Sequence, residues 1–254
     1  MTAGTAPFRV ILLPGSVLPG ELAYGSLVAA LGSDTDAVVK ELEVYATPEA
    51  PADYALDLEV AGVMRAADER GWERFHLVGY SGGGAAALAF TARHSERVAS
   101  LAVLEPAWAG RWDLSPAEDA FWRESDRLET LAPDDFMRTF MRLAVKPEVE
   151  LPPPPQADPP PWMVKRPGGI RAFMRTFRTY HLDRDALARF GRPVYFGLGG
   201  LSKPRPVRRD RHSAERGLPR LPPRSVRGAA PLRSAASDRT RAARGLAEST
   251  LAPR

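Results

Sequence analysis

The chain has 254 residues and no cysteine, and 44% of its residues are apolar, which is enough to bury one sizeable core. Without cysteine, the sequence excludes disulfide scaffolds, cysteine-ligated zinc sites and catalysis by a thiol. Residues 1–7 are too few and too polar for a signal peptide, and no run approaches the roughly 18 apolar residues of a membrane span. We therefore expect a cytoplasmic protein with no membrane partner.

The net charge of +4 is distributed unevenly along the chain. Residues 203–254 contain 13 Arg and one Lys against two Asp and two Glu, a net of +10, so residues 1–202 carry −6. Every aromatic residue, isoleucine and methionine lies before residue 203. We therefore expect a boundary between Ser202 and Lys203, followed by an irregular or disordered tail.

Short apolar runs rich in β-branched residues alternate with helical patterns over the first two hundred residues. This alternation predicts βαβ units around a mostly parallel sheet, and hence an α/β fold. We expect strands at 8–13, 38–45, 75–79, 98–104 and 193–198. Between them we expect helices at 21–31, 54–70 and 82–94, with Gly71 ending the second as a C-cap glycine.

The segment between the fourth and fifth expected strands has no strand pattern and predicts helices at 116–128, 134–143, 169–180 and 183–190. Within it, residues 151–162 contain seven prolines and are expected to form a stiff polyproline-type connector. The predicted organisation is a core at 1–107, a helical cap at 108–191, a core strand at 192–202 and the tail at 203–254.

A glycine-serine motif at residues 79–83 indicates a catalytic nucleophile. The third expected strand runs into Gly79-Tyr80-Ser81-Gly82-Gly83, and an alanine-rich helix follows at once. G-x-S-x-G between a strand and a helix is typical of a nucleophile elbow, in which glycines allow a tight turn. The turn would present the Ser81 hydroxyl as nucleophile and the Gly82 N–H as an oxyanion donor at a helix N-terminus. A plain glycine-rich turn is the alternative.

This motif and the order of elements resemble the α/β-hydrolase superfamily, over residues 8 to about 202. The resemblance implies a doubly wound, mostly parallel sheet with an inserted helical cap. It also implies a serine hydrolase acting on a small ester or related acyl substrate, with no metal or organic cofactor. A loop after the first strand supplies the family's second oxyanion donor. Here that loop is Leu13-Pro14-Gly15-Ser16-Val17, with Pro14 in place of the family's histidine.

The N–H of Ser16, or alternatively that of Val17, is the donor that the resemblance implies; an ordinary turn without a donor is the other reading. The implied acid is Glu105, which follows the fourth expected strand as in haloalkane-dehalogenase-like members. Its alternative role is to cap the first turn of the cap. We expect Tyr80 and Trp108 to bind substrate. We expect most other cap aromatics to pack the cap against the core, and one or two of them to line an apolar acyl pocket instead. These are Trp112, Trp122, Phe136, Phe140, Trp162 and Phe173.

The general base that such a serine needs is missing from its usual late position. We expect His76, in a strand, and His94, at a helix end, to be structural. His181 lies in the cap, and His212 is the only histidine of the tail. One hypothesis is that residues 203–254 are read in a shifted frame, because their permitted codons read one base later are compatible with a histidine loop and an amphipathic helix.

Two other hypotheses stay open. If the tail is native as written, the chain is an inactive hydrolase-fold protein that binds without catalysis, or an arginine-rich arm contacts nucleic acid or anionic lipid through charge alone. The tail has no aromatic residue to stack on bases, so we expect no specific nucleic-acid partner. The sequence leaves the oligomeric state open.

Overall fold

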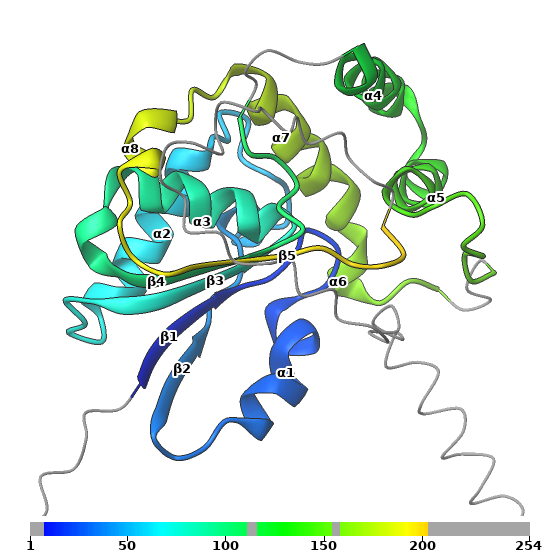
Figure 1. The fold of residues 1–254 in the computed structure, drawn as a ribbon. Coiled ribbons are helices and arrows are strands. Elements are labelled where there is room, and N and C mark those ends of the chain that lie inside the picture. Colours follow the sequence, from blue (N-terminus) through cyan, green and yellow to red (C-terminus); the bar gives the residue numbers. More distant parts are fainter. Residues whose placement is uncertain (1–7, 111–115, 154–157, 203–254) are drawn as a thin grey trace, which may run out of the picture.

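The computed structural model describes residues 8–110, 116–153 and 158–202 (Figure 1). Five strands form one parallel sheet in the order β2-β1-β3-β4-β5. They are β1 (Phe8–Leu13), β2 (Thr35–Val39), β3 (Phe75–Tyr80), β4 (Val98–Leu104) and β5 (Val194–Gly197). The predicted α/β class with a mostly parallel sheet is therefore confirmed. Within the described ranges, no helix is both long and apolar enough to cross a membrane.

Helices cover both faces of this sheet, as a doubly wound fold requires (Figure 1). On one face lie α2 (Leu56–Asp68), α3 (Gly82–Arg93) and α8 (Arg184–Ala188), and on the other lies α1 (Gly20–Ala30). In strand β3, alternate side chains pack on the two faces of the sheet. Phe75 and Leu77 are buried under α2 and α3, whereas Val78 packs on the α1 side, because successive strand residues point to opposite faces.

The first-half helices begin and end close to the predicted residues. In α2, Leu56, Val60, Val63 and Ala67 are buried, at the spacing of one helical face. Gly71 then adopts a φ of +64°, and the Trp72 N–H reaches back to the carbonyl of Ala67 at 2.9 Å. The glycine ends the helix as predicted, because the left-handed conformation is unfavourable for residues with a Cβ.

The strand predicted over 38–45 is wrong in its bounds. Strand β2 ends at Val39, and a short 3-10 turn, η1 (Glu43–Tyr45), takes the place of its expected second half. The reason is the buried carboxylate of Glu59. It accepts the backbone N–H groups of Glu43 and Val44, at 2.8 and 3.0 Å, so these groups do not pair with a neighbouring strand. Val44 and Tyr45 are still buried, which produced the apolar pattern.

The cap segment contains helices near three predicted places, namely α4 (Pro116–Arg127), α5 (Pro133–Ala144) and α7 (Arg166–Thr179), with the 3-10 turn η3 (Leu128–Thr130) after α4. A short helix, α6 (Pro161–Val164), was not predicted and begins within the expected polyproline-type connector, because proline is tolerated in the first turn of a helix. Helices α5 and α7 share a small apolar cluster through Phe136, Ile170 and Met174. By contrast, Phe173 and Phe177 of α7 belong to the main core. Helix α7 therefore connects the cap cluster to the sheet domain.

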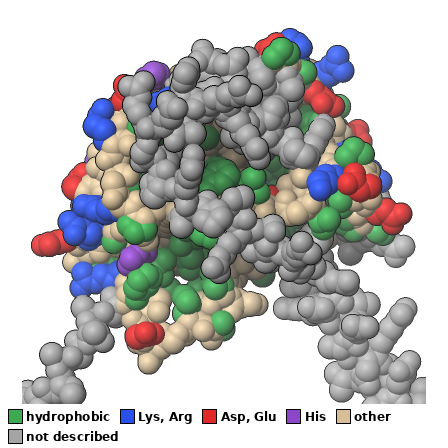
Figure 2. Space-filling model, viewed as in Figure 1, with side chains coloured by type: hydrophobic (Ala, Val, Ile, Leu, Met, Phe, Trp, Pro, Cys, Tyr) green, Lys and Arg blue, Asp and Glu red, His purple; other side chains and the backbone are tan. Residues whose placement is uncertain are grey.

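Strand β5 forms one edge of the sheet in the described part of the chain. Its side chains are poorly covered there, and Tyr195 and Phe196 are 42% and 50% exposed. Leu198 and Leu201 in the following loop are also exposed. Figure 2 shows hydrophobic side chains in the middle of this face, the part of the view that β5 crosses in Figure 1. The predicted tail lies outside the described residues.

Candidate active site

Ser81 lies between β3 and α3 with a φ of 50° and a ψ of −114°. A positive φ is uncommon for a residue with a side chain and places Ser81 in strained backbone. Hydrogen bonds hold the strained turn against the end of β4. The Ser81 N–H donates to the carbonyl of Leu104 at 3.0 Å, and the Ser81 carbonyl accepts the N–H of Ala107 at 2.8 Å. Ser81 thus stands on a rigid turn at the carboxyl end of the sheet.

The glycines on either side of Ser81 are required by close backbone contacts. A Cβ on Gly79 would lie 2.3 Å from the carbonyl oxygen of Gly83. A Cβ on Gly83 would lie 2.4 Å from the carbonyl oxygen of Pro14. Backbone atoms cannot move away as the end of a side chain can. The structure thereby explains why the G-x-S-x-G pattern has glycine at both of its ends.

The loop after β1 lies against this turn. The N–H of Gly83 donates to the carbonyl of Pro14 at 3.1 Å. A Cβ on Gly82 would meet the Ser16 hydroxyl oxygen at 2.3 Å, and one on Gly15 would lie 3.3 Å from the Ser81 Cβ. The N–H of Gly82, the first residue of α3, has no intrahelical acceptor. The structure therefore brings together Ser81, Gly82 and Ser16.

Two buried tyrosines that sequence reasoning missed hold the same loop. The Tyr24 hydroxyl donates to the carbonyl of Leu13 at 3.0 Å, and the Tyr45 hydroxyl donates to the carbonyl of Ser16 at 2.7 Å. Burial raises the pKa of both tyrosines well above the ordinary value, so both hydroxyls keep their protons at neutral pH. In the sequence, both tyrosines are simply flanked by small or apolar residues. This pattern does not indicate that they bind the carbonyls of Leu13 and Ser16.

Glu105 lies directly after β4, as predicted, and has a φ of 45°. Its N–H donates to the carbonyl of Gly197 at 2.8 Å, which continues the pairing with β5. Its carboxylate accepts the N–H of Gly199 at 2.7 Å and the Ser202 hydroxyl. In the described residues, these bonds attach the loop after β5 to the end of β4.

The two predicted substrate-binding residues lie in different surroundings. The Tyr80 ring lies on the α1 face, where a Cβ on Gly15 would meet it at 2.8 Å. Trp108 is 4% exposed and stacks on Phe177, with ring centroids 5.4 Å apart. Its indole N–H is buried and has no hydrogen-bond partner among the described residues. Trp108 therefore packs α7 against the core but keeps an unused donor.

Another cap aromatic reaches the turn itself. Phe173 of α7 is buried, and its ring would lie 3.5 Å from a Cβ on Gly82. Its ring also meets that of Tyr54 edge-on, with centroids 5.2 Å apart. Trp122 packs partly buried against the core, Phe136 and Phe140 stack within the cap, and Trp112 lies outside the described residues. Phe173 thus gives the serine turn an apolar neighbour.

The three described histidines lie away from Ser81. His76 is near the start of β3 and precedes Ser81 by five residues, roughly 16 Å of extended chain at about 3.3 Å per residue. It stacks on Phe8 and hydrogen-bonds Ser100 at 2.7 Å, and burial lowers its pKa. His94 follows the C-terminus of α3, the end opposite Ser81.

His181 is exposed and follows Tyr180, whose ring packs under Arg93 in the last turn of α3. It therefore also lies near the end of α3 that is remote from Ser81. His212 lies outside the described residues. Among the described residues, therefore, no histidine lies beside Ser81, the predicted nucleophile.

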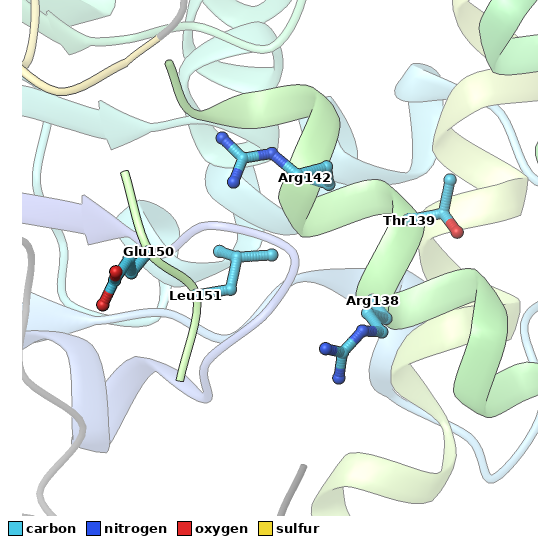
Figure 3. A pocket seen from close by; sticks show the side chains of 5 residues that line it. All are labelled: Arg138, Thr139, Arg142, Glu150 and Leu151. Carbon is cyan, nitrogen blue, oxygen red and sulfur yellow. The ribbon is translucent and has the colours of Figure 1, made fainter. Parts of the chain in front are cut away.

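A surface pocket of about 480 Å³ lies elsewhere, between α5 and residues 150–151 (Figure 3). Arg138, Thr139 and Arg142 line it from the helix. Arg142 also donates to the carbonyl of Val149 at 2.7 Å, so this arginine has a structural role. In the part of the chain that the structure describes, no cluster of three or more His, Asp or Glu side chains could hold a metal ion.

Known proteins support the assignment of the fold. A family model described as the alpha/beta hydrolase fold matches residues 48–183, more than half of the chain. The chain belongs to the alpha/beta hydrolase fold family. No curated protein sequence matches it.

Solved structures of similar fold include an esterase from Exiguobacterium antarcticum, with a TM-score of 0.57 at 18% identity over 75% of this chain and 73% of that one. A hydrolase from Pseudomonas aeruginosa has a TM-score of 0.55 at 18% identity, over 76% of this chain and 72% of that one. A bacterial membrane phospholipase A has a TM-score of 0.52 at 21% identity, over 76% of this chain. The chain spans 63% of that phospholipase, which is less than two thirds of its length. The family model and these structures therefore agree on the fold.

Proposed function

We propose that this alpha/beta hydrolase is a serine hydrolase acting on a small ester or related acyl substrate. The observation that carries the proposal is the position of Ser81. Its strained φ of 50°, at the start of a buried helix and beside the loop of Ser16, is the geometry of a side chain presented for attack. A plain turn would need neither the strain nor two flanking glycines.

In the proposed reaction, the Ser81 hydroxyl oxygen forms a bond to the substrate carbonyl carbon while a base accepts its proton. The N–H of Gly82 and that of Ser16 or Val17 stabilise the negative oxygen of the tetrahedral intermediate. The intermediate collapses to an acyl-serine as the alcohol leaves with the proton. Water then attacks the acyl-serine and releases the acid.

The base must come from outside the described residues, because the described histidines are remote from Ser81. Glu105, or a carboxylate from outside the described residues, would orient this base. Glu105 already holds Gly199 and Ser202, so such a role would compete with its structural contacts. No metal or organic cofactor is required by this scheme.

Aromatic side chains around the turn favour an apolar acyl group. Phe173 lies over Gly82. The Trp108 ring stacks on Phe177, the neighbour of Phe173, and its indole N–H is buried without a partner among the described residues. A buried donor without a partner is costly, and a substrate oxygen would satisfy it. We propose that Trp108 and Tyr80 contact the substrate, that the protein acts in the cytoplasm, and that it has no specific nucleic-acid partner and no membrane partner.

Hydrolysis of p-nitrophenyl butyrate tests the proposal, with Ser81→Ala and a matched control, Ser100→Ala. The Ser100 hydroxyl is hydrogen-bonded to His76 at 2.7 Å, so these two residues are an alternative serine–histidine pair. In the chain that has its base, whether as written or with the frame restored, the proposal predicts that Ser81→Ala lowers the turnover at least about 10³-fold and that Ser100→Ala does not. Loss of turnover in Ser100→Ala alone would refute it.

A second function is favoured by the lack of a described histidine near Ser81. In that case the chain binds an acyl ligand without turning it over. Tight binding of a substrate, with no turnover in either the chain as written or a frame-restored chain, would support this alternative.

A further inference from the structure

Tyr45 connects the candidate oxyanion loop to helix α7. Its hydroxyl donates to the carbonyl of Ser16 at 2.7 Å, and its ring is 2% exposed. The neighbouring Val17 packs on the cap cluster. One buried hydroxyl thus reaches the loop from a segment 29 residues away in sequence.

Helix α7 fixes the Tyr45 ring from the other side. The Arg166 guanidinium carbon lies 3.9 Å from the centroid of this ring, within range of a cation–π interaction. Arg166 is 1% exposed, and its Nε and Nη1 atoms have no hydrogen-bond partner in the described part of the chain. Lys165 donates to the Tyr45 carbonyl, and Gly169 leaves room for the ring, since a Cβ there would lie 2.0 Å from Cε1.

The hydrogen bond from the Tyr45 hydroxyl to the Ser16 carbonyl fixes the orientation of the Ser16–Val17 peptide plane. The described chain has no cis peptide bond, so the Ser16 carbonyl and the Val17 N–H point in opposite directions. When Tyr45 holds the carbonyl, the N–H is directed away from Tyr45. The peptide plane at one of the two candidate donors is therefore set by a side chain that does not touch the substrate.

We propose that Tyr45, clamped by α7, is a positioning residue that fixes the Ser16–Val17 peptide for oxyanion stabilisation beside Gly82. The oxyanion role rests on the proposed function, whereas the effect on the peptide does not. Through this contact, the cap helix α7 controls the geometry of the loop.

The test compares Tyr45→Phe with Tyr54→Phe in the full chain. Each change removes one hydroxyl from a buried ring, but the Tyr54 hydroxyl donates to Glu59 at 2.8 Å and not to the loop. Amide hydrogen exchange at Ser16 and Val17 is the first readout and needs no activity. Losing one hydrogen bond predicts about fivefold faster exchange in Tyr45→Phe and no local change in Tyr54→Phe.

The second readout is the labelling of Ser81 by a fluorophosphonate. Tyr45→Phe should lower the first-order labelling step about fivefold and leave probe binding unchanged, because the hydroxyl acts only on the loop. Tyr54→Phe should leave both constants unchanged.

The outcomes separate the two claims. If the exchange of both loop amides is the same in the parent and in Tyr45→Phe, or if both variants change it equally, the inference is wrong. Labelling of Tyr45→Phe at the parent rate would overturn the oxyanion role while leaving the hydrolase proposal intact. If no variant is labelled in either the written or the frame-restored chain, the hydrolase proposal fails, and the exchange data alone decide the effect of Tyr45 on the peptide.

Discussion

Two adjacent glycines of α7 allow a direct comparison of packing around Tyr45. A Cβ on Gly168 would have nothing within 4 Å, whereas one on Gly169 would lie 2.0 Å from Cε1 and 2.6 Å from Cζ of Tyr45. Reaching ordinary contact at 3.4 Å requires the ring to move by about 1.4 Å. Because Tyr45 is 2% exposed and holds Ser16, this movement strains the core and lengthens the hydrogen bond to the loop.

The gain in helix propensity opposes the cost of overpacking, and the two variants should therefore differ in their free energy of unfolding. Alanine gains up to roughly 1 kcal/mol over glycine in a helix, and this gain applies to both positions. At Gly169, overpacking costs about 1–3 kcal/mol and the weakened hydrogen bond about 1 kcal/mol. We expect Gly168→Ala to raise the free energy of unfolding by up to about 1 kcal/mol and Gly169→Ala to lower it by about 1–3 kcal/mol.

Urea unfolding followed by circular dichroism measures both variants against the parent. The exchange rates of the Ser16 and Val17 amides should rise in Gly169→Ala and stay unchanged in Gly168→Ala. Equal stability of the two variants would refute the reasoning, because it would show that Tyr45 is not packed against Gly169 as the structure has it.

Two other predictions concern charge and the tail. Burial raises the pKa of Glu59 above 4.5, so the folded state holds this proton more tightly than the unfolded chain. The contribution of Glu59 to the free energy of unfolding is then full below about pH 4.5 and is lost as the pH rises through the raised value. Urea unfolding should show the advantage of the parent over Glu59→Gln shrinking as the pH rises; a constant difference would contradict this. If residues 203–254 come from a shifted frame, His212→Ala leaves ester turnover unchanged and restoring the frame raises it at least about 10³-fold. A stop codon in the alternative frame, or loss of turnover in His212→Ala, would refute the frameshift.

The sequence predicted the parts of the fold that follow from periodicity. Strand β4 has the expected bounds, and helices α5 and α7 begin within a few residues of their own predicted starts. The reason is that the apolar residues of these elements recur at strand or helix spacing. The second half of the predicted 38–45 strand was wrong, since the buried carboxylate that captures Glu43 and Val44 comes from Glu59, fifteen or more residues later. Periodicity carries no information about such a long-range partner.

The candidate site divides in the same way. The tight turn at Ser81 and Gly82 was predictable, because a short motif with steric requirements encodes it locally. Tyr45 was not, since its role depends on a hydrogen bond to Ser16 and on a packing contact with Gly169. Both contacts join segments that are distant in sequence.

The central claim is that Ser81 is a nucleophile on a strained turn. The most direct measurement is to incubate the full chain with a fluorophosphonate and locate the adduct by peptide mass spectrometry. We expect a single adduct on Ser81, lost in Ser81→Ala and retained in Ser100→Ala. An adduct on Ser100 or another serine, or no adduct in either the written or the frame-restored chain, would contradict it.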